Sequence, residues 1–183
     1  MTQRVTVRGG LLGHMLVADD AAGAGAVVDD DLLPELPAHL RGQDAAEEVR
    51  ALAESGASVS LSPYTEMRIG FGFPPTGELL AARIPVGLSV DTTALSGNAD
   101  MFAIMKAIQN IENSRAQNEF KLPARRVLEL ATVEGARSLG IDDRVGSLKA
   151  GKRADLIMVN TREVNMGVFT EPAHMLVEAA QPS

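Results

Sequence analysis

The pattern of apolar and polar positions is most regular over residues 84–111, where a strand, a loop and a helix are predicted in succession. Apolar side chains dominate 84–90, which is typical of a strand covered on both faces. Residues 92–100 are small and polar, as in a loop. The next segment places its apolar residues at helical spacing: Met101, Ile104, Met105, Ile108 and Ile111. Strand, loop and helix in this order form one unit of a parallel α/β fold.

Further elements are predicted on both sides of this unit. Asp44 is a candidate N-cap for a helix that ends before Gly56, while Pro34 and Pro37 argue against a regular element just upstream. The predicted strands are 4–8, 57–61, 145–148 and 154–160, and the predicted helices are 45–55, 76–83, 123–131 and 132–139. The alternation of strands and helices indicates the α/β class.

Composition narrows the possible functions. The chain has 183 residues, 45% of them hydrophobic but only 3% aromatic, so one domain with an aliphatic core is expected. A net charge of −7 argues against nucleic acid or an anionic membrane as a partner. The absence of Cys excludes disulfides, thiolate metal sites and a Cys nucleophile. The sequence shows no transmembrane run and no signal-peptide core, so a cytoplasmic protein is expected.

Asp91 is the first candidate for chemistry, because it follows the predicted strand 84–90 directly. Ligands of parallel α/β folds gather where the strands end at their carboxyl termini. The alternative is a structural aspartate whose carboxylate caps its own loop in an Asx-turn. The pattern by itself leaves both interpretations open.

Two passages resemble the amidohydrolase superfamily. Residues 128–160 read LELATVEGARSLGIDDRVGSLKAGKRADLIMVN and resemble the C-terminal segment of these enzymes. The resemblance is to the branch of cytosine, guanine and S-adenosylhomocysteine deaminases and triazine chlorohydrolases. Residues 51–91 are similar to the second half of the barrel of the same enzymes, and the whole resemblance covers 45–177.

The resemblance implies a fold. The family has a (β/α)8 TIM barrel beside a small β-sandwich built from both chain ends. A complete barrel takes about 250 residues, so we expect the second half of a barrel followed by C-terminal sandwich strands. The expected divisions are a weakly defined segment 1–44 with room for one barrel strand and a loop, barrel units over 45–140, and sandwich strands with a tail over 141–183.

The resemblance also implies an activity. It predicts a deaminase-like hydrolase that uses metal-activated water, with zinc or iron, to break a carbon–nitrogen bond of a small heterocyclic or amide-type substrate. Asp91 matches the residue that binds the metal and acts as general base, His39 is the candidate second ligand, and Glu66 is a candidate substrate-binding residue. A carboxylate beside such a water can take its proton and pass it to the leaving nitrogen.

The sequence departs from the family pattern at the metal ligands. The His-x-His pair of the first barrel strand is absent, and Leu61 stands where the family usually has a histidine. Asp91 and His39 are fewer ligands than the three protein ligands of a typical catalytic zinc site. Glu66 also fits a solvated loop glutamate. The alternative function is therefore a truncated or diverged fragment without catalysis, acting as an oligomerising or binding module. An open half-barrel exposes strand edges, so a homo-oligomer is expected.

Four other polar residues are interpreted as structural. Glu134 is expected to complement a helix dipole, and Asp155 belongs to the sandwich turn in the family. His14 and His174 have no motif around them and are expected to be packing or surface residues.

Overall fold

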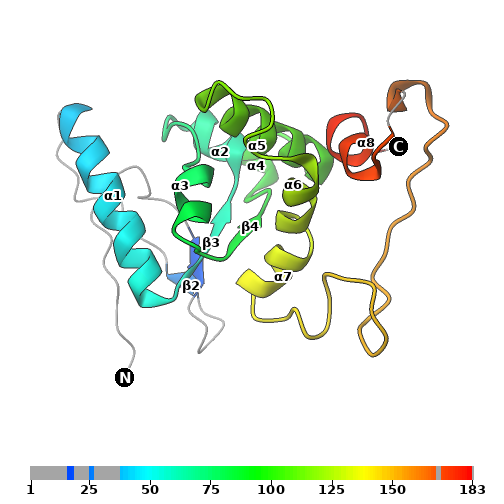
Figure 1. The fold of residues 1–183 in the computed structure, drawn as a ribbon, viewed down its shortest axis with the longest axis horizontal. Coiled ribbons are helices and arrows are strands. Elements are labelled where there is room, and N and C mark those ends of the chain that lie inside the picture. The colour runs from blue at the N-terminus through cyan, green and yellow to red at the C-terminus, as the bar shows by residue number, and fades with distance from the viewer. Residues whose placement is uncertain (1–15, 19–24, 27–37, 168–169, 183) are drawn as a thin grey trace.

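A four-stranded sheet flanked by helices forms the centre of the molecule (Figure 1). The computed structural model describes residues 16–18, 25–26, 38–167 and 170–182. The strands are β1 (Leu16–Ala18), β2 (Gly25–Ala26), β3 (Ser58–Leu61) and β4 (Val86–Leu88). The helices are α1 (Ala38–Ser55), α2 (Pro63–Arg68), α3 (Thr76–Ala81), α4 (Thr93–Ser96), α5 (Met101–Arg115), α6 (Ala124–Leu130), α7 (Val133–Ser138) and α8 (Pro172–Glu178), with a 3-10 turn at Val164–Met166.

The parallel pair β3 and β4 is the part of the sheet that positions the candidate site. Val59 lies opposite Val86 and Leu61 lies opposite Leu88. The ladder extends by a hydrogen bond in which the Ser89 N–H donates to the Leu61 carbonyl oxygen at 2.9 Å. The two strands therefore end side by side, and the residues that follow them face each other.

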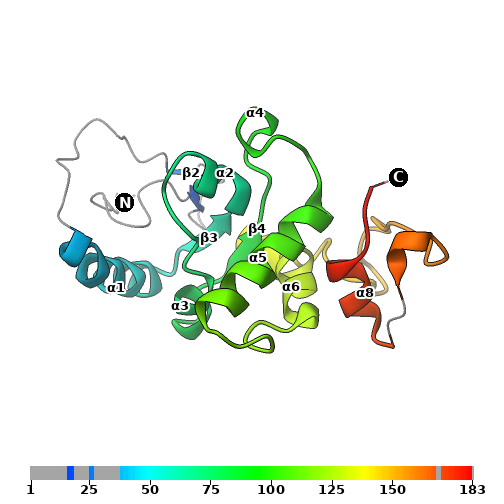
Figure 2. The same cartoon turned by 90° about the horizontal axis from the view of Figure 1, so that it is seen from above.

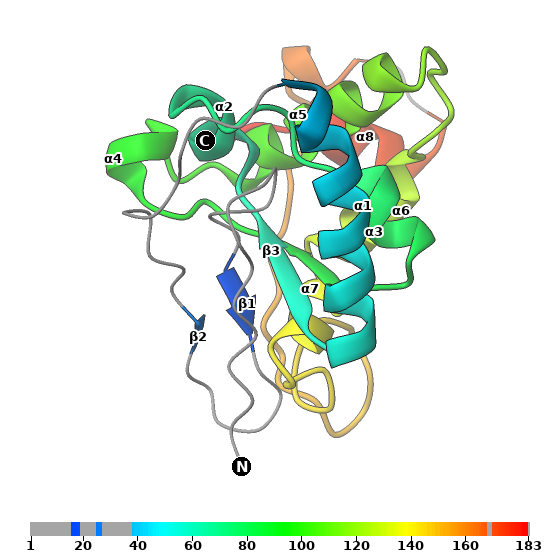
Figure 3. The same ribbon diagram turned by 90° about the vertical axis from the view of Figure 1, so that its left-hand side faces the viewer.

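The other side of β3 carries antiparallel strands. β1 pairs antiparallel with β3, and β2 pairs antiparallel with β1 (Figure 3). The sheet order is therefore β2-β1-β3-β4. This edge differs from the all-parallel barrel expected from the sequence, because a barrel strand has parallel neighbours on both sides. The strand predicted at 4–8 lies outside the described residues.

The helices pack against the sheet, and the buried side chains between them form one hydrophobic core. The apolar stripe predicted for the long helix is confirmed in α5, where Ile104, Met105 and Ile108 are buried. α8 packs against both α5 and α6 (Figure 2). The largest wholly buried apolar side chains come from β3, β4, several helices and the 3-10 turn: Leu52, Val59, Leu61, Leu79, Val86, Ile104, Ile108, Val127, Leu130, Met166 and Val177.

A close backbone approach fixes β4 against α7. A Cβ atom on Gly87 would lie 2.7 Å from the Ser138 Oγ and 3.1 Å from the Gly135 Cα. Glycine at 87 and 135 therefore lets strand and helix meet without side chains between them. The Ser58 hydroxyl donates to the Ser138 carbonyl oxygen at 2.6 Å and ties β3 to the same helix.

The helix expected from Asp44 begins earlier. α1 starts at Ala38, so Asp44 lies inside the helix and is not its N-cap. Pro37 precedes the first helical residue in the sequence. The N–H groups at the start of a helix have no acceptor within the helix, so a proline at this point removes no helical hydrogen bond and does not prevent this start. His39 is consequently a helix residue and does not end a strand.

The two C-terminal strand predictions are wrong for this chain. Neither 145–148 nor 154–160 forms a strand, and no described strand lies beside them to supply a ladder. Three consecutive apolar side chains here stand in solvent, with exposed fractions of 60% for Leu156, 75% for Ile157 and 94% for Met158. The division of the chain at residue 141 stays a prediction.

Candidate functional site

The candidate site lies where β3 and β4 end. Ser62 follows β3 and Ser89 follows β4, and the parallel register brings their side chains together. Their hydroxyl oxygens are 2.9 Å apart. Each serine precedes an acid by a few residues, Glu66 after β3 and Asp91 after β4. The parallel pair therefore presents two carboxylates from neighbouring strand ends.

Glu66 lies in the first turn of α2 and is half-buried. Its Oε1 accepts a hydrogen bond from the Ser62 N–H at 2.6 Å. Burial raises the pKa of Glu66 to about 6, although the Ser62 hydrogen bond opposes the change, and the charge of Asp91 adds to the rise. The interpretation of Glu66 as a solvated loop residue is wrong, because the short helix α2 carries it toward the strand ends.

Asp91, three residues after the end of β4, has an unusual backbone conformation. Its φ angle is +61°, in the left-handed region that residues with a Cβ rarely adopt. The side chain is exposed, and the Asp91 N–H donates to the Ser89 Oγ at 2.9 Å. Among the described residues its carboxylate has no hydrogen bond. The Thr92 Oγ1 caps the loop instead, accepting from the Leu95 N–H at 3.3 Å, so the Asx-turn alternative is wrong.

The loop after Asp91 is held against α2. The Arg68 Nη1 donates to the Ala94 and Leu95 carbonyl oxygens, both at 2.9 Å. α2 carries Glu66 and α4 follows Asp91, so this contact links the two segments that supply the acids.

The fit of a metal depends on how many ligands meet here. Within the described part of the chain, no group of three His, Asp or Glu side chains is placed to hold an ion. Leu61, at the position for which the resemblance predicts a histidine, is an aliphatic residue wholly buried in the core. A catalytic zinc typically takes three protein ligands and a water. The described residues therefore do not form a complete zinc site, and the ligand roles of Asp91 and His39 stay predictions.

The four residues that were interpreted as structural are not part of the candidate site as the structure describes it. Glu134 is in the first turn of α7, as expected, and its side chain is only 14% exposed. Asp155 is exposed in the irregular segment, so its place in a sandwich turn is not seen. His174 is an exposed residue of α8 whose N–H donates to the Glu171 carboxylate, and His14 lies outside the described residues.

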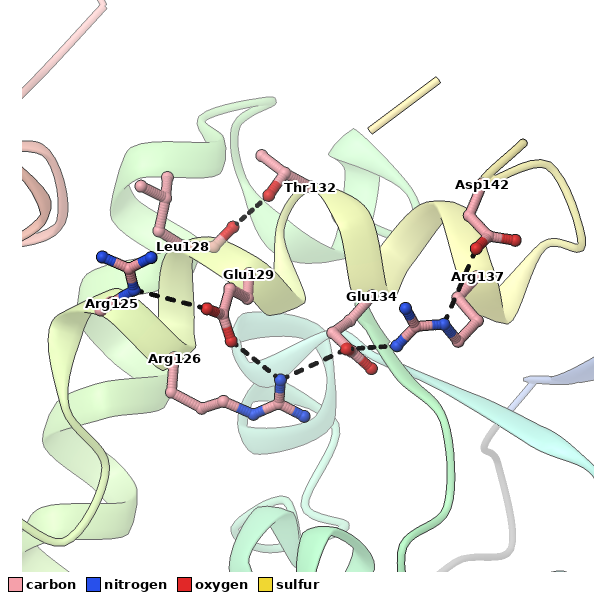
Figure 4. Close-up of polar contacts among 8 residues, drawn as sticks. All are labelled: Arg125, Arg126, Leu128, Glu129, Thr132, Glu134, Arg137 and Asp142. Carbon is pink, nitrogen blue, oxygen red and sulfur yellow. Dashed lines mark hydrogen bonds and ion pairs between the residues drawn. The ribbon is translucent and has the colours of Figure 1, made fainter. Parts of the chain in front are cut away.

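Glu134 belongs to a line of alternating charges that joins α6 to α7 (Figure 4). Arg126 Nη1 lies 3.0 Å from Glu129 Oε2 and 3.4 Å from Glu134 Oε1. Burial lowers the pKa of Arg126, but hydrogen bonds and charges from Glu129 and Glu134 raise it more, for a net rise. The line continues from Glu134 to Arg137 at 2.5 Å. Each member is paired within it, which indicates a structural role.

Ser62 and Ser89 are site residues that the residue pattern alone did not single out. The available signal was a small hydroxyl residue at the carboxyl end of each of two predicted strands, Ser62 directly after 57–61 and Ser89 within the last two residues of 84–90. Serine is common in loops, so this signal gains meaning only when the register of the strands is known.

Comparison with known proteins identifies the group to which the chain belongs. The model of the amidohydrolase family matches residues 7–181. The chain belongs to the amidohydrolase family. This agrees with the two passages that resembled the family in the sequence.

Relatives of this amidohydrolase chain include deaminases and a triazine hydrolase. It is 34% identical over 145 residues to 5-methylthioadenosine/S-adenosylhomocysteine deaminase of Desulforamulus reducens, covering 79% of this chain and 32% of the relative. It is 30% identical over 149 residues to S-triazine hydrolase of Gordonia rubripertincta, covering 81% and 30%. The chain thus spans about a third of the length of these curated relatives.

A solved structure supports the fold. An adenosine deaminase from Xanthomonas campestris with bound zinc superposes with a TM-score of 0.70 at 30% identity, covering 74% of this chain and 31% of that one. The likeness implies a TIM-barrel-type fold, of which this amidohydrolase chain contains a part. No helix among the described residues combines the length and apolar character needed to cross a membrane.

Proposed function

We propose that this chain is the second-half barrel part of an amidohydrolase that removes an amino group from a small nitrogen heterocycle. The observation that carries the proposal is the exposed carboxylate of Asp91 after the end of β4, which has no hydrogen bond to a described residue and lies near the half-buried Glu66. Ligand sites of such folds lie at these strand ends. The names of the relatives support the reaction class, since they include deaminases of adenosine derivatives.

The proposed chemistry divides two proton-transfer roles between the acids. Asp91 takes a proton from the attacking water, a C–O bond forms at the ring carbon, and the proton passes to the amino nitrogen as the C–N bond breaks and ammonia leaves. Glu66, with its pKa raised to about 6, binds the substrate through a ring nitrogen and shares a proton with it. Two acids in unlike environments suit such a division.

Zinc or iron is the cofactor proposed for the complete active site. In hydrolases such an ion supplies Lewis-acid activation of water. Asp91 and His39 are the ligands proposed from this chain. Since the described residues do not complete the site, the steps above assign only proton transfers to Asp91 and Glu66.

Release of ammonia from adenosine derivatives, guanine, cytosine and aminotriazines tests the proposal. We expect metal-supplemented chain to release ammonia from at least one of them, and Asp91→Asn to lower the rate by about 100- to 10,000-fold, as for other general bases. Asp155→Asn is the matched control, because Asp155 is an exposed aspartate in the irregular C-terminal segment. Absence of turnover by the wild-type chain with metal present would contradict the proposal and leave the non-catalytic fragment as the function.

A further inference from the structure

The left-handed backbone of Asp91 requires support. An aspartate at φ +61° places its Cβ close to backbone atoms, a conformation that is unfavourable without compensating contacts. Glycine would remove this strain, but a glycine has no carboxylate. The conformation sets the direction in which the side chain leaves β4, so the contacts that hold it also orient the carboxylate.

Ser89 supplies a direct contact to the Asp91 backbone. Its Oγ accepts the Asp91 N–H at 2.9 Å, closing a local turn over two residues. The backbone of Ser89 is itself fixed, because its N–H continues the parallel ladder to the Leu61 carbonyl oxygen at 2.9 Å. The Ser89 hydroxyl therefore holds the Asp91 backbone in a fixed position relative to the sheet.

Ser62 holds the Ser89 hydroxyl from the neighbouring strand. The two Oγ atoms are 2.9 Å apart, and Ser62 is only 8% exposed. The Ser62 N–H donates to Glu66, so the same residue also anchors the second acid. By contrast, the Ser96 hydroxyl in α4 donates to the carbonyl oxygens of Thr92 and Asn98, within its own loop.

We propose that Ser89 is a positioning residue, whose hydroxyl, held across the strands by Ser62, fixes the left-handed backbone of Asp91 and thereby aims its carboxylate. The proposal rests on the catalytic role proposed for Asp91. In this proposal the serine pair connects the ends of the two strands. The orientation of Asp91, which follows β4, therefore depends on Ser62, which follows β3.

A matched pair of substitutions tests the hydroxyl in the full chain. Ser89→Thr keeps the oxygen, whereas Ser89→Val has nearly the same shape without it. The readouts are the amide hydrogen exchange rate and the one-bond N–H residual dipolar coupling of Asp91, measured by NMR. We expect Ser89→Val to speed exchange by about fivefold and to change the coupling, because a hydrogen bond of ordinary strength is lost. Ser89→Thr and the control Ser96→Ala should match the wild type.

Ser62→Ala provides a second arm that leaves Ser89 intact. We expect a change of the same sign at Asp91, smaller than that of Ser89→Val, because the Ser89 hydroxyl is retained but no longer held. Wild-type exchange and coupling at Asp91 in Ser89→Val would overturn the proposal, and so would equal changes in Ser89→Thr and Ser89→Val.

Turnover separates this proposal from the proposed function. In a chain that releases ammonia, Ser89→Val should lower kcat by about 10- to 100-fold with KM little changed, since small misplacements of a reacting group have effects of this size. Unchanged kcat would overturn the positioning role. A wild-type chain without turnover would contradict the proposed function, while the NMR comparison would still decide whether Ser89 fixes the Asp91 backbone.

Discussion

At the scale of single residues, the two acids of the candidate site differ in environment. Glu66 is half-buried on α2 and its carboxylate accepts a backbone hydrogen bond, whereas Asp91 is exposed and its carboxylate is free among the described residues. Burial favours the neutral form of Glu66, and the charge of Asp91 acts in the same direction. Glu66 therefore keeps its proton to a higher pH than an ordinary glutamate does.

Glu66→Gln should stabilise the protein at alkaline pH. The folded pKa of about 6 exceeds the ordinary value of 4.5, so stability from the protonated form is complete below pH 4.5 and is lost as the pH rises through 6. Glutamine keeps an oxygen for the Ser62 N–H without the charge. We expect a gain of about 1–2 kcal/mol in the free energy of unfolding at pH 8, and none below pH 4.5.

Urea unfolding across this pH range, with a chelator present, measures the effect. Glu119→Gln is the control, since Glu119 is an exposed glutamate, and its effect should stay small at every pH. A gain for Glu66→Gln that did not change with pH would contradict the assigned cause.

The position of Asp91 could be predicted from the sequence, but its surroundings could not. A dense apolar run followed by an acid identifies a strand end, because burial dictates the run. The serine pair depends on the register of β3 against β4, which no local pattern specifies. The half-buried state of Glu66 likewise depends on α2, a helix of six residues that has too few turns to show a clear periodicity.

At the scale of elements, short helices are held by contacts outside themselves. α6 and α7 have seven and six residues, lengths at which isolated helices are marginal. The charges in Figure 4 join them, and glycines 87 and 135 bring α7 against β4. Long or periodic elements such as α5 were predictable, whereas the C-terminal strands failed because a strand also needs a partner, which the sequence pattern does not show.

Arg126→Gln should weaken the junction of α6 and α7. Its guanidinium lies within reach of two carboxylates, Glu129 and Glu134, and its side chain is 33% exposed. We expect a loss of about 0.5–1 kcal/mol in the free energy of unfolding at low salt, and a smaller loss in 1 M salt, because ions screen such pairs.

Arg125→Gln is the matched control for this change. Arg125 is 81% exposed and, within the described part of the chain, pairs with Glu129 alone, at 3.6 Å, so its replacement should change stability by less than about 0.3 kcal/mol. Equal losses for the two arginine variants, or a loss for Arg126→Gln that salt does not reduce, would show that the network does not act through charge.

At the scale of the whole molecule, apolar surface remains uncovered. Leu156, Ile157 and Met158 stand in solvent one after another, and Leu148 is 80% exposed in the same segment. Exposed apolar runs of this kind promote association. The expected homo-oligomer stays a prediction, and this segment is where the structure would place the contact.

The double substitution Ile157→Lys and Met158→Lys should reduce self-association. Light scattering over a range of concentrations is the measurement, and we expect the wild-type protein to grow in apparent mass while the double variant stays near the 19.3 kDa of one chain. Leu139→Lys removes an apolar group that is 67% exposed on another segment and should behave as the wild type. A wild-type protein that stays monomeric throughout would contradict the prediction.

The antiparallel strand β1 has one more consequence. Each edge of a strand can form a single ladder, and β1 uses the edge of β3 that does not face β4. Closure into a cylinder needs a parallel neighbour on that edge. Leu16–Ala18 therefore occupies the edge of β3 at which a further barrel strand would pair. Pairing of β3 with β1 and pairing of β3 with such a strand would use the same backbone hydrogen-bonding groups, so only one of the two can form at a time.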